Sequence, residues 1–272
     1  MVSPVEHLVC FHHVIQYWAQ KRPETVAFHY LPDGESVTTT LSYAQLDRQA
    51  RQVAQMLRGH GLSKRPVLLQ FRPGTDFIVA FFGCLYAGAI AVSAYPPGSN
   101  RSKTDRLQKL IASSQATTIL TNQETLAEVQ RESEGEAFAM LCLEEALSEE
   151  STEWQETALT GEDIAFLQYS SGSTGDPKGV IVTHANLMSN QRAIRQGMGN
   201  GDHTVFASWL PLFHDMGLIG NVMQPLYLGV SCWLMPPMAF LQKPLRWLKL
   251  ISEAGVTCLG GRILPMRCVS TR

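Results

Sequence analysis

Two long stretches of this 272-residue chain contain no charged residue, so any fold must remove them from water. They run over residues 77–100 and 216–242, and each is long enough to cross a membrane. The first contains Gly88 and the turn Tyr95-Pro-Pro-Gly98, and the second is interrupted by Pro225. We therefore expect no membrane span, and we expect the first stretch to form a buried helix, a strand and a turn.

The residues around the first stretch alternate between strand and helix patterns. Residues 67–71 form a short apolar run between two prolines, residues 75–86 suit a helix, and residues 89–94 suit a second strand. A basic helix from residue 101 and a strand over residues 117–121 repeat the pattern. A strand, a helix and a further strand in this order predict parallel pairing and the α/β class.

The first 60 residues add two helices and a hairpin. Apolar residues at helical spacing predict a helix from Phe11 to Trp18, and a turn at Pro32-Asp-Gly34 predicts a hairpin over residues 26–41. Ser42 then stands as the N-cap of a helix that ends at Gly59 or Gly61.

Charge and cysteine content exclude several classes of protein. The chain has 22 Lys and Arg against 24 Asp and Glu, a balance that argues against nucleic-acid binding and against a polybasic membrane surface. Six widely spaced cysteines without a CxxC pair predict reduced thiols in the cytoplasm, not disulfides or a zinc site. Most of the acidic residues lie between Glu124 and Asp163, which predicts a solvated surface or, alternatively, a docking face for a basic partner.

The chemically informative segment is a loop between two strand-like runs, residues 165–169 and 180–184. Its ten residues are small or polar, and they combine glycines, hydroxyls and one ammonium: Ser170, Ser171, Gly172, Ser173, Thr174, Gly175, Asp176, Pro177, Lys178 and Gly179. Glycines let the backbone approach a ligand closely, while amides, hydroxyls and an ammonium match a polyphosphate. The spacing fits neither the GxxxxGK[ST] P-loop, nor the GxGxxG dinucleotide fingerprint, nor the GxSxG nucleophile elbow.

This loop resembles the phosphate-binding signature [ST]SG[ST]TGxPKG of the adenylate-forming, AMP-binding enzymes. The resemblance continues in residues 85–92, which are similar to an upstream core motif, and in Trp209-Leu-Pro-Leu-Phe-His-Asp-Met-Gly217. The Tyr95-Pro-Pro97 turn, the His-Asp-Met-Gly wording and residues 240–248 are similar to the fatty acyl-AMP ligase branch. Ser93 departs from the proline that this branch often has there.

The resemblance implies an enzyme that uses ATP and Mg²⁺ to activate a fatty acid as acyl-AMP. The acyl group would pass to an acyl carrier protein or a polyketide synthase. Residues 170–175, Lys178 and Gly179 would bind ATP, with Lys178 and His214 catalytic. His214 would orient the fatty acid carboxylate or gate its entry, and Asp215 would orient the His214 ring. Met216, Leu218, Met223, Leu226 and Trp233 are candidates to line an acyl tunnel, although ordinary core packing explains them equally well.

The resemblance ends at Gly261. The acidic motif whose Glu holds Mg²⁺, the ribose-binding Asp and the C-terminal Lys of the family do not follow, so no metal ligand is assigned in this chain. Codons for residues 262–268 can be written so that a one-base shift encodes Pro-Asn-Phe-Ala-Tyr-Ala-Leu, the family's continuation. We therefore expect residues 1–261 to be a partial AMP-binding domain and residues 262–272 a frameshifted tail.

This interpretation predicts a chain that is inactive alone and prone to aggregate. Two alternatives remain open at the level of sequence. One is a fragment of a long-chain fatty acyl-CoA synthetase, which differs in the acceptor of the acyl group. The other is a non-catalytic nucleotide-binding or pseudogene remnant.

Overall fold

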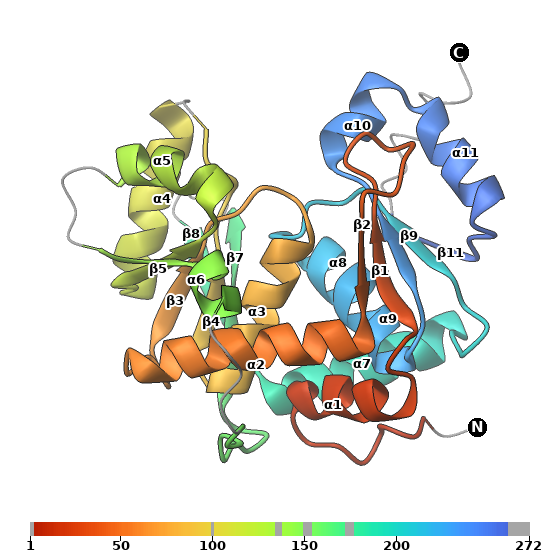
Figure 1. Cartoon of the computed structure of the whole chain (residues 1–272), viewed down its shortest axis with the longest axis horizontal. Coiled ribbons are helices and arrows are strands. Elements are labelled where there is room, and N and C mark those ends of the chain that lie inside the picture. Colours follow the sequence, from red (N-terminus) through yellow and green to blue (C-terminus); the bar gives the residue numbers. More distant parts are fainter. Residues whose placement is uncertain (1–2, 99–100, 134–137, 149–153, 172–176, 261–272) are drawn as a thin grey trace.

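The structure is a computed structural model that describes residues 3–98, 101–133, 138–148, 154–171 and 177–260. At residues 101–106, 170, 171 and 177 it describes the backbone alone. The predicted frameshifted tail, residues 262–272, lies outside the described residues. Within them the strands form two sheets that stand side by side, with helices between them and on their outer faces (Figure 1).

The larger sheet confirms the α/β prediction. Its strands lie in the order β6 (Ala139–Cys142), β5 (Thr118–Thr121), β3 (Pro66–Leu69), β4 (Ile90–Ser93), β7 (Ile164–Ser171) and β8 (Pro177–Thr183). Strands β6 to β7 are parallel, as expected for strands joined through helices, and β8 pairs antiparallel with β7. Strand β8 is an edge strand, and its Val180 and Ile181 are exposed.

The smaller sheet has the order β11 (Cys258–Gly260), β9 (Phe206–Ser208), β10 (Cys232–Leu234), β1 (Val26–Tyr30) and β2 (Thr39–Ser42). Strands β1 and β2 form the predicted antiparallel hairpin, and the other neighbours in the sheet are parallel. This sheet brings together strands from both ends of the described chain.

Helices connect and cover the strands. They are α1 (Phe11–Lys21), α2 (Tyr43–Gly59), α3 (Thr75–Ala87), α4 (Arg101–Ser114), α5 (Gln123–Glu132), α6 (Leu143–Ser148), α7 (His184–Met198), α8 (Asp215–Leu218), the π-helix η1 (Ile219–Met223), α9 (Gln224–Leu228), α10 (Pro237–Gln242) and α11 (Leu245–Glu253). Ser42 caps α2 as predicted, because its hydroxyl accepts from the Gln45 amide while the Gln45 side chain accepts from the Ser42 amide.

Alternating side chains of the larger sheet face two different apolar cores. Val67 and Leu69 of β3 lie in the main core between the sheets, where α3 packs, whereas Leu68 faces α4 and α5 on the outer side. Both faces of this sheet are therefore buried, which explains why its strands read as continuous apolar runs. A third core lies between the smaller sheet and helices α10 and α11, around Phe240 and Trp247.

The first uncharged stretch lies largely in the main core, whereas the second is buried only in part, with Met216, Met238 and Leu241 exposed. Residues 77–87 belong to the fully buried helix α3, which is followed by β4 as predicted. No helix in the described ranges combines the length and the apolar character needed to cross a membrane.

Several acidic side chains of the region from Glu124 to Asp163 bind basic residues of the same chain. Glu124 and Glu128 flank Arg72 at 3.2 and 2.8 Å, and Asp163 lies 3.3 Å from the Lys64 ammonium. These ion pairs favour a solvated, self-paired surface over a docking face for a basic partner.

Candidate functional site

The signature loop lies at one end of the antiparallel hairpin β7–β8. Strand pairing continues farther toward the loop than the sequence predicted, because Ser170 is opposite Lys178 and Ser171 is opposite Pro177. Five of the ten residues predicted to form the turn therefore belong to the strands, and residues 172–176 connect them. Of the predicted phosphate ligands, Gly172, Ser173, Thr174 and Gly175 lie outside the described residues, as do the side chains of Ser170 and Ser171.

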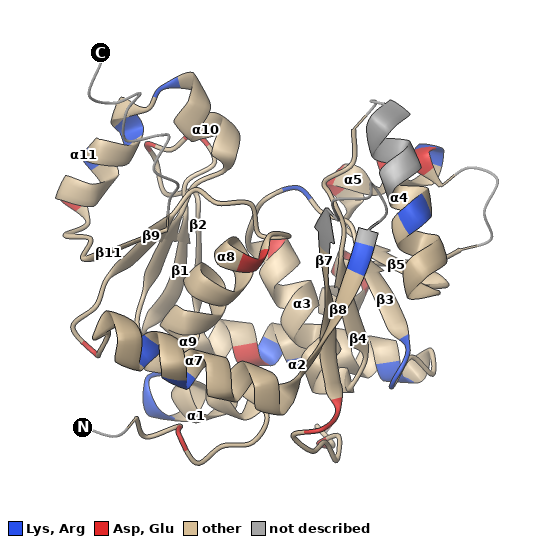
Figure 2. Ribbon diagram, turned by 180° about the vertical axis from the view of Figure 1, so that it is seen from behind, with Lys and Arg blue, Asp and Glu red and all other residues tan. Residues whose placement is uncertain are grey.

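Lys178 and Gly179 belong to strand β8 and not to the loop. The Lys178 side chain is exposed, and Figure 2 shows one blue segment, the colour of Lys and Arg, on β8. Pairing with Ser170 fixes the backbone of Lys178 beside the loop, while its charge stays in water. This is a suitable place for a cation that meets an anionic ligand arriving from solvent.

Gly179 has a packing role that the local sequence pattern does not indicate. A Cβ at this position would lie 2.8 Å from Tyr169 Cζ, closer than carbon atoms approach without strain. Its absence lets the Tyr169 ring cross β8, and the Tyr169 hydroxyl lies 3.1 Å from Ser113 Oγ on α4. The predicted contact between Gly179 and a phosphate stays a prediction.

His214 and Asp215 lie in a second segment, at the start of α8. His214 is the N-cap residue of α8, and its Nδ1 lies 2.5 Å from Asp215 Oδ1. The same carboxylate oxygen accepts the amide of Met216 at 2.7 Å. Both side chains are exposed to solvent, and the predicted contact between His214 and Asp215 is present.

Immediate neighbours of these residues bring the two segments together. The side-chain amide of Gln168, on β7, donates to the carbonyl oxygen of Phe213 at 3.2 Å. The Phe213 ring also packs against Tyr95, which follows β4, with ring centroids 4.7 Å apart. The His214 segment is therefore attached to the hairpin that carries Lys178 and to the end of β4. Sequence motifs marked all three regions but not the Gln168 contact that joins them.

The five residues considered for an acyl tunnel do not share one surface. Leu218, Met223 and Leu226 are completely buried in the main core. Met216 is exposed, and Trp233 stacks on His29 with ring centroids 4.0 Å apart. Core packing accounts for the three buried side chains.

The described residues offer no group of metal ligands beside Lys178 or His214. The clusters of His, Cys and carboxylate side chains close enough to share an ion involve Cys10, His12, His13, Glu156 and His184, around the N-terminal end of α1. The requirement for Mg²⁺ stays a prediction from the family resemblance.

Comparison with known proteins finds a matching family and relatives that are named as fatty acid ligases. The AMP-binding enzyme family matches residues 15–261. A medium-chain-fatty-acid–acyl-carrier-protein ligase of Teredinibacter turnerae is 36% identical over 92% of this chain and 45% of its own length. A long-chain-fatty-acid–AMP ligase of Mycobacterium marinum is 35% identical over 86% of this chain and 42% of its own length.

The fold comparison agrees with the sequence comparison. The structure of a fatty acyl-adenylate ligase from Legionella pneumophila, in complex with acyl adenylate and pyrophosphate, matches 95% of this chain and 45% of its own. The TM-score is 0.87 and the sequence identity is 36%. The chain thus spans less than half the length of these three relatives.

Proposed function

Because this chain belongs to the AMP-binding enzymes, in the fatty acyl-AMP ligase branch, we propose that it binds ATP and is the part of a ligase that activates a fatty acid. In this reaction the fatty acid carboxylate attacks the α-phosphorus of ATP. A C–O–P mixed anhydride, acyl-AMP, forms, and the bond to pyrophosphate breaks. The observation that carries the proposal is the β7–β8 hairpin, with its signature loop and the exposed Lys178 beside it.

To promote this reaction, the protein must position the carboxylate and ATP and compensate the negative charge of the phosphates. Residues 170–175 would hold the β- and γ-phosphates through amides and hydroxyls. Lys178 would add a charge-assisted contact to the same phosphates, because its ammonium is already placed on the strand that leaves the loop. Pyrophosphate carries more charge than the phosphates it derives from, so this contact also favours its departure.

His214 would orient the carboxylate of the fatty acid. Its ring is held at Nδ1 by Asp215 at 2.5 Å, and the backbone beside it is held by Gln168. A ring fixed in this way presents the other nitrogen, Nε2, in one direction. We assign His214 to carboxylate positioning, with Asp215 acting through it.

We propose that the acyl group passes to an acyl carrier protein, since the Teredinibacter relative is named for that acceptor. A polyketide synthase carrier domain belongs to the same class of acceptor. The alternatives are transfer to coenzyme A and a remnant that binds nucleotide without catalysis. The cytoplasmic location, the requirement for Mg²⁺ and the partial domain over residues 1–261 remain predictions from the sequence.

The test starts with ATP binding by the 272-residue chain, measured by titration calorimetry. Replacing Lys178 with Ala removes one charge-assisted contact, so we expect the Kd for ATP to rise about 10- to 100-fold. Lys249→Ala is the matched control, because Lys249 is an exposed lysine on α11 whose ion pair is with Glu253. Equal ATP affinity in the Lys178→Ala and Lys249→Ala variants would contradict the assignment of the hairpin.

Catalysis is tested by fatty-acid-dependent exchange of pyrophosphate into ATP. The 272 residues alone are not expected to catalyse this exchange. Exchange by the wild-type chain that is lost in His214→Ala would refute that expectation and support the site. The acceptor is tested on a chain extended to the length of the relatives, by offering a holo acyl carrier protein and coenzyme A in parallel. Acylation of coenzyme A alone would replace the carrier-protein proposal with the synthetase alternative.

A further inference from the structure

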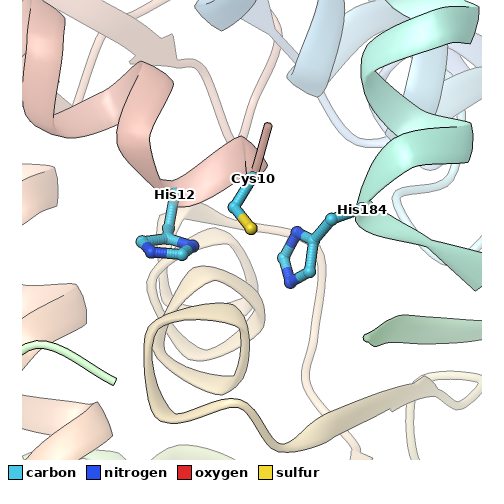
Figure 3. Close-up of side chains that lie close together, drawn as sticks. All are labelled: Cys10, His12 and His184. Carbon is cyan, nitrogen blue, oxygen red and sulfur yellow. The ribbon is translucent and has the colours of Figure 1, made fainter. Parts of the chain in front are cut away.

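Three side chains that suit a transition metal meet in the interior, away from the signature loop. Cys10 is the N-cap of α1, His12 lies in the first turn of α1, and His184 is the first residue of α7. They are 0, 1 and 1% exposed, and one ligand atom of each lies within 4.8 Å of the others. Figure 3 shows the three side chains pointing toward a common centre.

The histidines of this cluster lack the hydrogen bonds that buried imidazoles need. Neither ring nitrogen of His12 has a hydrogen-bond partner among the described residues. His184 Nδ1 accepts only a long hydrogen bond, 3.3 Å from the amide of Phe11. A buried polar atom without a partner costs about 1–3 kcal/mol, so an apolar side chain would serve core packing better. The unpartnered nitrogens of His12 can therefore be satisfied by a ligand that is not part of the chain.

Burial also leaves both imidazoles ready to bind a cation. It lowers the pKa of His12 to about 2 and the pKa of His184 to about 4, and His13 adds to the effect in both cases. Asp163 opposes it at His184, and Arg51 adds to it at His12. A neutral imidazole has one nitrogen lone pair free for a metal.

A carboxylate lies behind His12 in the position that metal sites commonly use. Glu156 Oε1 is 3.5 Å from His12 Nε2 and 2.8 Å from His13 Nε2. A histidine that binds a metal through one nitrogen usually directs the other toward a carboxylate, which selects the tautomer. A proton on Nε2, directed toward Glu156, would leave the lone pair of His12 on Nδ1. Nε2 of His12 lacks hydrogen-bond geometry to Glu156, and a small rotation of the ring would provide it.

We propose that Cys10, His12 and His184 bind one transition-metal ion, with Zn²⁺ as the ion that one thiolate and two imidazoles suit best. On binding, the Cys10 thiol releases its proton to solvent as the sulfur–metal bond forms. Tetrahedral zinc holds its ligand atoms roughly 3.5 Å apart, so side-chain rotations that move each ligand atom by about 1 Å would close the site. The amide of Phe11 would lose its long hydrogen bond to His184, and the fourth position is left for water.

The metal would tie together elements that are distant in sequence. Phe11 and His184 are separated by 173 positions, and His184 directly follows β8. A bound ion would therefore link α1 to the base of the hairpin whose other end carries Lys178. The site is structural and does not depend on the function proposed above.

The test uses the full chain after treatment with EDTA. In a titration with Co²⁺, a spectroscopic substitute for Zn²⁺, the chain should bind one equivalent of the ion and show a sulfur-to-cobalt charge-transfer band. Zn²⁺ should displace it, and at a hundredfold excess over its Kd should raise the Tm by about 5 to 10 °C. X-ray absorption of the zinc form should show one sulfur and two imidazole ligands, a measurement that needs no variant.

Variants then locate the site. Cys10→Ala should abolish the charge-transfer band and weaken Zn²⁺ binding by more than about a hundredfold, whereas Glu156→Gln should weaken binding about 10- to 100-fold. Cys142→Ala is the matched control, because Cys142 is also buried but bonds to Glu144 instead. The proposal is overturned if wild-type protein gives no such band, if X-ray absorption shows no sulfur ligand, or if Cys10→Ala and Cys142→Ala behave alike.

Discussion

The two ends of strand β8 place polar groups in opposite environments. At the tip, which carries the signature loop, Lys178 is exposed to water on an edge strand. At the base, His184 directly follows the strand and is buried with Cys10 and His12. Seven residues of extended chain, roughly 20 Å, separate the two ends.

This contrast shows how one hairpin can serve binding and stability at once. The tip keeps its charge hydrated, so a change there should alter ligand affinity more than folding. The base has already lost its water, so a change there should alter folding directly. We therefore expect effects on stability to decrease from the base, through the segment around His214, to the tip.

The largest effect on stability should come from lowering the pH, which protonates the buried histidines at the base of the hairpin. Burial lowers the pKa of His12 to about 2 and of His184 to about 4, while both titrate near 6.5 in an unfolded chain. Because the folded-state pKa values are depressed, the unfolded chain binds more protons below pH 6.5. The stability is present above that pH and is lost as pH falls toward the folded values. From pH 7 to pH 5, the free energy of unfolding should fall by about 2 kcal/mol per histidine.

Urea unfolding of the EDTA-treated chain at several pH values measures this loss. His184→Gln should remove about half of the pH dependence, and His203→Gln, at an exposed histidine, should leave it unchanged. An undiminished pH dependence of the unfolding free energy in His184→Gln would show that the buried His184 does not cause the loss of stability in acid.

An intermediate effect is expected where the His214 segment is packed. A Cβ on Gly217 would lie 2.1 Å from the carbonyl oxygen of Pro211, and backbone cannot rotate aside as a side chain can. Gly217→Ala should therefore cost about 1–3 kcal/mol of unfolding free energy, despite the higher helix propensity of alanine. Gly220→Ala is the control, because nothing lies within 4 Å of its Cβ position. Equal unfolding free energies for the two variants would refute the close packing of α8 against Pro211.

The smallest effect is expected near the tip. Tyr169→Phe removes the hydroxyl that lies 3.1 Å from Ser113 Oγ, a contact exposed to solvent. We expect a loss of about 0.5–1 kcal/mol in unfolding free energy. Ser113→Ala should cost a similar amount, and the double variant should lose no more than either single one. Additive losses would show that the two hydroxyls act independently.

Sequence patterns predicted the elements around the site because those patterns are local. The Ser42 cap depends on Gln45, three residues away, and the alternation of strands and helices depends on runs of about ten residues. The boundary of the signature loop was harder to predict, since polar residues such as Lys178 can continue a strand when a partner strand is available. Tyr169, which requires glycine at position 179, became visible only in the paired strands.

The sequence alone determined the α/β class, the hairpin that bears a phosphate-type loop, and the resemblance to acid-activating enzymes, because each is written in neighbouring residues. Only the tertiary structure decided that Gln168 meets Phe213 and that Cys10 and His12 meet His184. The physical reason is burial: whether a polar side chain loses its water depends on which distant segments pack over it. No spacing along the chain records that.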